Sequence, residues 1–541
     1  MDLILKNGKV VTMDENNPRA EAVAIKDGKF FEVGSNKEVL KLKEGKTKII
    51  DLEGKVLLPG FIDSHMHFLD FGYSLTKVDL NGSKSIDEII NRTNKFFKNK
   101  DIKEGDWLKG RGWNQDILEE NRFLNRYDLD KISKEKPIYM TRVCGHVAVV
   151  NTKALEVMGV NKNTEQVDGG HFDLDEKGEP TGIFREKALE LIYSKVPSPN
   201  VAEIKNMILK ATEAYAEQGI TSVQTDDFET IPGVNYEDVI RAYIELADQG
   251  KLKTRIYEQC IFDNIEKYKG FLGKGYRTGD GNNLFKIGPL KVLSDGSLGG
   301  RTAYMTQPYA DDESTVGIPC YSQEELDEWI LTAQKNNMTT ATHCIGDAAM
   351  YMTLDSIEKA KKEIPKKDMR HSIVHCQITD KKIIKRFSKL NVVAHVQPVF
   401  LDYDLHIVED RIGKERAKYT YNFKRMIDEG VVVAGGSDYP YCEFYQTFYN
   451  LHAAINRQDL SGYPKEGWLP EEKLSVDEAV SIFTKGAAYA SYEEDIKGAI
   501  EKGKLADCFL ISDDIYTIDS SKIKDLFVEL TLMDGKIVYK K

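Results

Sequence analysis

The sequence contains no apolar run that approaches the roughly 18 residues of a membrane-spanning helix, so no segment predicts a membrane span. Its opening residues, MDLILK, lack the basic start and the long apolar core of a signal peptide. We therefore expect a cytoplasmic protein that does not bind a membrane.

An excess of positive charge is also missing. Lysine and arginine number 75 against 87 aspartates and glutamates, which gives a formal net charge of −12. A protein that binds the phosphate backbone of nucleic acids needs a basic surface. We therefore expect no nucleic-acid partner and a small molecule as the substrate.

Paired cysteines and two common catalytic motifs are absent as well. The seven cysteines are an odd number without paired spacing, which favours reduced thiols over a disulfide framework. No G-x-S-x-G nucleophile elbow occurs. The glycine-rich segment SDGSLGG lacks the spacing of a phosphate-binding loop. These absences exclude a serine hydrolase of the nucleophile-elbow type and a P-loop enzyme.

What the 541 residues do contain is an alternation of β-rich runs and helical stretches. One helical stretch, 322–338, opens with a capping box of Ser322 and Glu325. We predict eight strands, at 57–67, 219–226, 252–261, 284–296, 339–344, 371–376, 392–398 and 431–440. Eight strand–helix units predict an α/β fold with a (β/α)₈ TIM-like barrel, in which reactive residues lie where strands end.

The regions outside this alternation predict the remaining organisation. Short strands separated by glycine turns occupy residues 1–56, and the same pattern returns over 497–541. We expect the two termini to build one composite β-sandwich domain, with the barrel over 57–496. The stretch from about 70 to 200 is too long for a strand–helix connection, so we interpret it as an inserted lid region that covers the barrel mouth.

Metal-binding residue types follow several of the predicted strands. His65 and His67 end the first strand and lie two residues apart, so they point to the same side. His343, His375 and Asp438 end three later strands. A single histidine at a strand end is commonly structural, but burying this whole set at one rim is costly without a partner. Neutral imidazoles suit a divalent transition metal such as zinc, which would supply that partner.

Several motifs resemble those of the amidohydrolase superfamily: LPGFIDSHMH, THCIGD, RHSIVHCQ, GGSDYP and KGKLADCFLI. The segments GHVAVVNTKAL, GEPTGIFREKA and KVLSDGSLGGRTA more narrowly resemble amidohydrolase family 3, the subgroup of YtcJ-like proteins and N-substituted formamide deformylases. The resemblance covers nearly the whole chain, with its motifs in the expected order. It implies a metal-dependent hydrolase, and superfamily members often form homodimers.

The resemblance also implies a ligand set for one or two divalent metals per chain. His65 and His67 would bind the more buried metal, His343 and His375 would bind the second, and Asp438 would join the first. Zinc fits these ligands, and manganese, cobalt or iron fit them too.

Lys291 matches the position of a carboxylated lysine that bridges two metals in many superfamily members. The alternative is an ion pair of Lys291 with Asp295 or with another nearby carboxylate. Lys286 is a second candidate for the modification, although it lies near the start of its strand.

Five further residues are expected to line the substrate pocket or to orient the substrate: Arg111, Trp113, His146, Glu186 and Arg301. Trp113 has packing as its alternative role, and Glu186 and Arg301 have structural ion pairs. Asp226 and Asp347 are interpreted as residues that support ligands or cap helices.

The expected reaction is hydrolysis of a non-peptide carbon–nitrogen bond, as in an N-acyl or N-formyl compound. A metal lowers the pKa of its bound water toward about 7, which makes hydroxide available at neutral pH. Asp438 is the expected catalytic residue: it would take the proton and pass it to the leaving nitrogen, a role that calls for a raised pKa.

Three alternatives remain: a deaminase, an esterase or lactonase on the same barrel, and a non-catalytic degenerate barrel. The deaminase is disfavoured because Asp347, rather than the usual glutamate pattern, follows His343.

Overall fold

The structure is a computed structural model that describes residues 1–98, 100 and 102–541. These residues form two units. The first unit comprises residues 1–71, 208–230 and 235–541, and the second comprises residues 72–207 and 231–234.

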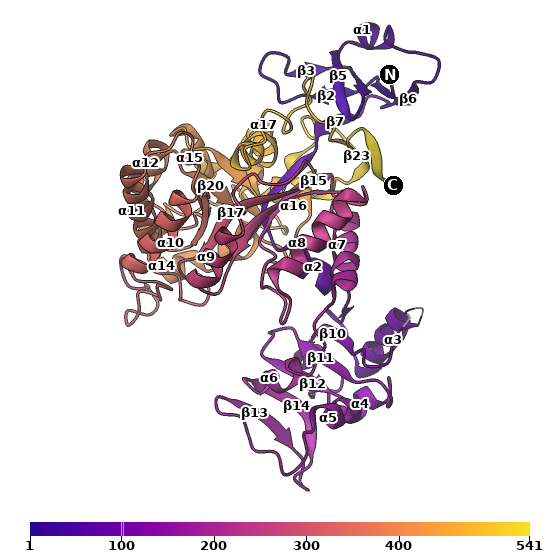
Figure 1. The fold of residues 1–541 in the computed structure, drawn as a ribbon, viewed down its shortest axis with the longest axis vertical. Helices are drawn as coiled ribbons and strands as arrows, with labels where there is room; N and C mark the ends of the chain where they lie inside the picture. The colour runs from indigo at the N-terminus through magenta and orange to yellow at the C-terminus, as the bar shows by residue number, and fades with distance from the viewer. Residues whose placement is uncertain (99, 101) are drawn as a thin grey trace. The chain divides into compact units, whose positions relative to one another are not determined.

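An eight-stranded sheet forms the centre of the first unit (Figure 1). Every neighbouring pair of its strands is parallel. The sheet consists of β8 (Phe61–Met66), β15 (Ile220–Thr225), β16 (Arg255–Ile261), β17 (Phe285–Leu293), β18 (Thr340–Cys344), β19 (Ser372–His375), β20 (Val393–Val396) and β21 (Val433–Gly435). All eight predicted strands are present, and the predicted TIM-like barrel is confirmed.

Helices occupy most of the connections between these strands and the segment that follows the last strand. They include α7 (Val201–Ala216), α8 (Tyr236–Asp248), α9 (Ile265–Gly273), α10 (Gln323–Lys335), α11 (Asp347–Glu363), α12 (Lys381–Leu390), α13 (Leu401–Asp404), α14 (Val408–Ala417), α15 (Phe423–Asp428), α16 (Thr447–Asn456), α17 (Val476–Ser481) and α18 (Ala487–Ala490). The predicted capping box of Ser322 and Glu325 opens α10.

Side-chain and backbone hydrogen bonds join the first barrel strand to the segment after the last one. The Asp438 amide donates to the carbonyl of His65 at 2.8 Å. The Asp63 carboxylate accepts from the amide and the hydroxyl of Ser437, at 2.9 and 2.6 Å. Burial raises the pKa of Asp63 to about 7. These bonds hold the ends of β8 and β21 together where the candidate ligands lie.

One predicted strand boundary is wrong. The run 57–67 divides into β7 (Val56–Pro59) and β8, with Gly60 between them. A Cβ atom on Gly60 would lie 2.2 Å from Thr221 Oγ1, so the chain passes its neighbour too closely for any side chain. β7 pairs with strands of a different sheet, whereas β8 belongs to the barrel.

The two termini of the chain contribute to a pair of smaller sheets (Figure 1). One sheet contains β1 (Leu3–Lys6), β4 (Ala22–Lys26), β5 (Lys29–Gly34) and β6 (Lys48–Asp51). The other contains β2 (Lys9–Val11), β3 (Arg19–Ala20), β7, β22 (Cys508–Ile511), β23 (Val528–Met533) and β24 (Lys536–Lys540). Buried side chains of both sheets, such as Leu5 and Leu530, share one hydrophobic core.

The second unit has a mixed six-stranded sheet of its own. Its strands are β9 (Val78–Asp79), β10 (Leu108–Trp113), β11 (Ile138–Arg142), β12 (Val147–Val150), β13 (Gly170–Leu174) and β14 (Pro180–Glu186). Its helices are α3 (Ile86–Phe97), α4 (Arg126–Asp130), α5 (Thr152–Met158) and α6 (Leu189–Tyr193). Two clusters of buried apolar side chains stabilise this unit. Its function as a lid stays a prediction.

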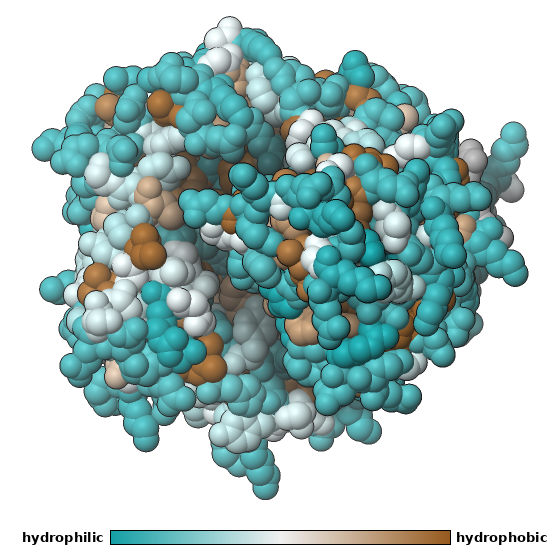
Figure 2. Space-filling model, turned by 90° about the horizontal axis from the view of Figure 1, so that it is seen from below, coloured by the Kyte–Doolittle hydropathy of each residue, from teal (hydrophilic) through white to brown (hydrophobic). Residues whose placement is uncertain are grey.

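Within the described residues, no helix has the length and apolar character needed to cross a membrane. Hydrophilic side chains prevail on the face shown in Figure 2, and hydrophobic ones form small separate groups there.

Candidate metal centre

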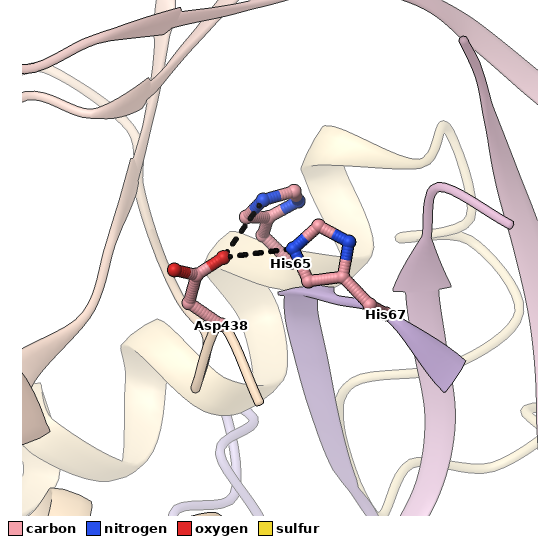
Figure 3. Close-up of side chains that lie close together, drawn as sticks. All are labelled: His65, His67 and Asp438. Atoms are coloured by element: carbon pink, nitrogen blue, oxygen red, sulfur yellow. Dashed lines mark hydrogen bonds and ion pairs between the residues drawn. The ribbon is translucent and has the colours of Figure 1, made fainter. Parts of the chain in front are cut away.

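Three side chains from the two ends of the barrel sheet converge on one point (Figure 3). His65 and His67 lie at the end of β8, and Asp438 follows β21. Asp438 Oδ1 is 3.2 Å from His65 Nε2 and 3.2 Å from His67 Nε2. Ligands about 2.1 Å from a tetrahedral zinc ion lie roughly 3.4 Å apart. The three donor atoms are therefore spaced as a shared metal requires.

Two more imidazoles lie beside this group. The rings of His343 and His375 have centroids 4.5 Å apart, and the His375 ring is 5.6 Å from that of His65. His375 and Asp438 have positive φ angles of 78° and 61°. Residues other than glycine rarely adopt this backbone conformation, and such strain gathers at functional sites. The structure thus brings together all four predicted histidines and Asp438.

The Nδ1 atom of each imidazole faces a buried acceptor. His65 Nδ1 lies 2.8 Å from Gln259 Oε1, and His375 Nδ1 lies 2.9 Å from Gln397 Oε1. The partners of the other two Nδ1 atoms are carboxylates: Asp226 for His67, and Asp295, at 3.0 Å, for His343. Such contacts fix the ring orientation and leave the Nε2 atoms for a metal.

Lys291 lies inside the same cluster, almost completely buried. Its Nζ atom is 2.9 Å from His65 Nε2 and 3.1 Å from Asp226 Oδ2. The ion pair therefore forms with Asp226, a nearby carboxylate, and not with Asp295. The second candidate, Lys286, lies toward the other end of β17 and pairs with Glu493 at 2.7 Å.

Asp226, which the sequence suggested as a residue that supports ligands or caps a helix, contacts the candidate ligands in the structure. It directly follows β15, is 1% exposed and contacts both His67 and Lys291. The signal available in the sequence was a carboxylate at the end of a buried strand, the same signal that identified Asp438.

Asp295 is held by four donors. It accepts hydrogen bonds from the backbone amides of Tyr304, Ile345 and Gly346, at 2.8–3.0 Å, besides its contact with His343. Asp347 lies at the start of α11, where it accepts from the amide of Ala348 at 3.0 Å and also from the amide and hydroxyl of Thr306. This contact with the first turn of α11 agrees with the capping role that was one of the two interpretations of Asp347.

The charges of the cluster shift its pKa values. Burial and the ammonium of Lys291 lower the pKa of His65. Burial disfavours protonated His67 too, but the carboxylates of Asp226 and Asp438 raise its pKa to about 10. Burial would raise the pKa of Asp438, yet hydrogen bonds from His65 and His67 hold it well below its usual range. The expectation that the site raises the pKa of Asp438 is therefore wrong, because two imidazoles stabilise its carboxylate.

The residues present fit a divalent metal. Three donor atoms of the types that zinc prefers lie within 4.8 Å of one another. The carboxylates of Asp226 and Asp438 supply negative charge that a dication would compensate. The same negative charge favours the protonated form of His67. His65, His67 and Asp438 are the residues that would hold the ion.

The predicted substrate residues have varied surroundings. Trp113 is fully buried in the core of the second unit and donates to the carbonyl of Met140, so its expected place in a substrate pocket is wrong. Arg111 is exposed on β10. His146 and Glu186, both exposed, pair with each other at 3.0 Å. Arg301 pairs with Asp311 at 2.8 Å. The substrate roles of these four residues stay predictions.

Known proteins resemble the chain along its whole length. The sequence model of the amidohydrolase family matches residues 48–539. The putative amidohydrolase YtcJ of Bacillus subtilis (strain 168) is 32% identical over 550 aligned residues, which cover 100% of both chains. An N-substituted formamide deformylase of Arthrobacter pascens is 24% identical and covers 100% of this chain and 98% of its own.

A solved structure is similar over nearly the whole chain as well. It is that of an uncharacterized metal-dependent hydrolase from Pyrococcus furiosus, which is 28% identical with a TM-score of 0.78. The alignment covers 95% of this chain and 100% of that one.

Proposed function

The chain belongs to the amidohydrolase family of metal-dependent hydrolases, and we propose that it hydrolyses a carbon–nitrogen bond in a non-peptide amide, such as an N-acyl or N-formyl compound. The observation that carries this proposal is the convergence of His65, His67 and Asp438 at the carboxyl ends of the barrel strands. The deformylase relative, whose name states that it acts on formamides, supports this choice of bond.

The proposed cofactor is zinc, with one or two ions per chain. His65, His67 and Asp438 would hold one ion, and His343 and His375 offer donors for a second. A bound zinc supplies Lewis-acid chemistry, which acidifies water and polarises a carbonyl group.

The Lys291 Nζ atom lies 2.9 Å from His65 Nε2, where it would compete with a metal for that nitrogen. Carboxylation would remove the positive charge of this side chain and supply oxygen ligands. Carboxylated Lys291 is therefore part of the proposed centre.

Asp438 is the residue proposed to move the proton. Its Oδ1 atom faces the two imidazoles, whereas Oδ2 points away from them (Figure 3). In the proposed reaction the oxygen of water bonds to the carbonyl carbon, Asp438 takes a proton from that water, and the carbon–nitrogen bond breaks as the proton passes to the nitrogen. The products are a carboxylic acid and an amine.

The test is release of amine from a panel of N-formyl and N-acyl amines by the zinc-loaded protein. We expect hydrolysis of at least one amide, loss of activity after chelation and recovery when zinc is added back. An enzyme that cleaves esters of the same acids but no amide would contradict the proposed bond.

The variant Asp438→Asn tests the proposed proton transfer. General acid–base catalysis contributes about 10²–10⁴-fold, so we expect turnover to fall by at least about a hundredfold in protein whose zinc content, measured by mass spectrometry, equals that of the wild type. Unchanged turnover in zinc-loaded Asp438→Asn would overturn the role of this residue.

A further inference from the structure

A recess of about 270 Å³ opens beside Lys291, at the carboxyl ends of β15, β16 and β17. Its apolar wall is formed chiefly by Phe228, Ile261, Phe262, Leu293, Tyr321 and Trp329. Pockets for whole drug-sized ligands have volumes of about 300–1,000 Å³. This recess is therefore large enough for one substituent rather than for a complete ligand.

The strand register places the apolar wall next to the candidate metal ligands. Ile261 lies opposite Lys291, and Leu293 lies opposite His343. Leu293 and Lys291 are two residues apart on β17, so their side chains point to the same side of the sheet. An apolar surface thus begins directly beside Lys291 and His343.

Leu293 is 43% exposed, although its neighbours Lys291 and Val292 are buried. An apolar side chain exposed at the edge of a polar centre gains when a ligand covers it. Each methylene that a ligand buries against such a surface strengthens binding by about fourfold. The exposed Leu293 therefore favours a ligand with an apolar group.

The polar edge of the recess disfavours anionic groups. Glu229 and Asp263 line it, and Lys267 pairs with both at 2.7 Å. Lys291, which also lines the recess, is paired with Asp226. At the edge two carboxylates share the one ammonium group of Lys267, so the edge keeps a negative charge that repels an anion.

We propose that this recess binds a neutral apolar substituent of the substrate, carried next to the bond that is cleaved, and that Ile261 and Leu293 determine this specificity. The inference deepens the proposed function and rests on it, because the cleaved bond defines where the substituent is attached.

The experiment measures binding of hydroxamic acids, which chelate zinc, to the zinc-loaded full-length protein by titration calorimetry. The probes are acetohydroxamic acid, octanohydroxamic acid and an eight-carbon hydroxamic acid that ends in a carboxylate. We expect the octanoyl probe to bind at least about tenfold more tightly than the acetyl probe. The carboxylate-ended probe should bind more weakly than the octanoyl probe.

Variants of the recess test whether it causes the tighter binding of the octanoyl probe. Leu293→Ser and Ile261→Ala should each reduce the advantage of the octanoyl probe several-fold and leave binding of the acetyl probe unchanged. Ile537→Ser is the matched control, because Ile537 is 50% exposed on β24 in a terminal sheet. Equal binding of the two probes, or an advantage that survives in both recess variants, would overturn the proposal.

The outcome is distinguishable from failure of the proposed function. A chain-length preference that depends on Leu293, in a protein that hydrolyses no amide, would support the recess and contradict the reaction. Amide hydrolysis without any effect of chain length would contradict the recess alone.

Discussion

At the scale of single residues, Asp226 links two parts of the candidate centre. Its two oxygens contact different groups, Oδ1 facing His67 and Oδ2 facing Lys291. Since Lys291 is buried, a neutral amide at this position would leave its ammonium group without its counter-charge. If the amide oxygen still accepts from His67, the amide NH2 group must face the Lys291 ammonium, so the amide cannot satisfy both partners. Asp226 is therefore a positioning residue for the metal ligands.

We predict that Asp226→Asn lowers zinc affinity by about 10–100-fold, the usual effect of removing a group that orients a ligand. Competition with a chromophoric chelator measures this affinity without any substrate. Asp128→Asn is the matched control, because Asp128 is a buried aspartate of the second unit that pairs with Arg122. Equal zinc affinity in Asp226→Asn and the wild type would refute the positioning role.

The sequence predicted the candidate ligands better than the residues that orient them. His65, His343 and Asp438 end apolar runs, and that position identifies them without coordinates. Gln259 and Gln397 come from neighbouring strands, and only the strand register shows which histidine each one contacts. The signal available in the sequence was a glutamine within or next to a predicted strand, and this signal does not show which histidine the glutamine contacts.

At the scale of elements, β17 carries a lysine near each end, Lys291 buried and Lys286 partly buried. Lys291 faces the candidate centre, whereas Lys286 pairs with Glu493, which also binds the buried Lys497. Burial would raise the pKa of Glu493, but Lys497 and Lys286 lower it from 4.5 to about 2. This carboxylate therefore stabilises the folded chain as an anion between two cations.

We predict that Glu493→Gln destabilises the protein by about 3–5 kcal/mol at pH 7, because it leaves a buried ammonium without its partner. A depressed pKa contributes stability above about pH 4.5, and this contribution disappears as the pH falls toward about 2. The difference in urea midpoint between variant and wild type should therefore be largest at neutral pH and shrink below pH 4.5. A difference that stays constant down to pH 3 would contradict this account.

The strands themselves followed from residue patterning, because each barrel strand is a short apolar or β-rich run between turns or helices. The division of 57–67 into β7 and β8 did not, since both halves are apolar. The reason for the break is the close approach of Gly60 to Thr221, a residue more than 150 positions away in the sequence. The residue pattern of one segment carries no information about a contact with so distant a residue.

At the scale of the whole molecule, a buried ion pair joins the barrel to the sheets formed by the termini. Arg255 of β16 is 3% exposed and donates to Asp507, just before β22, at 2.7 and 2.9 Å. It also donates to Asp534, between β23 and β24, at 2.5 Å. The terminal strands are thus fastened to the barrel by charge as well as by apolar packing.

We predict that Asp507→Ala destabilises the protein by about 3–5 kcal/mol, since it removes one partner of a buried pair. Thermal unfolding of the metal-free protein measures the effect, with Asp514→Ala as the control because Asp514 pairs with the largely exposed Lys9. Melting temperatures that are equal in Asp507→Ala and in the control would show that the pair does not hold the sheets to the barrel.

The proposed metal centre requires one metal-binding point shared by the end of the first barrel strand and the segment after the last one. A crystal structure of the zinc-loaded protein, with an anomalous difference map recorded at the zinc edge, locates that point. We predict a peak within about 2.5 Å of His65 Nε2, His67 Nε2 and a carboxylate oxygen of Asp438. A fully occupied zinc peak elsewhere, with no peak among these three side chains, would contradict the account.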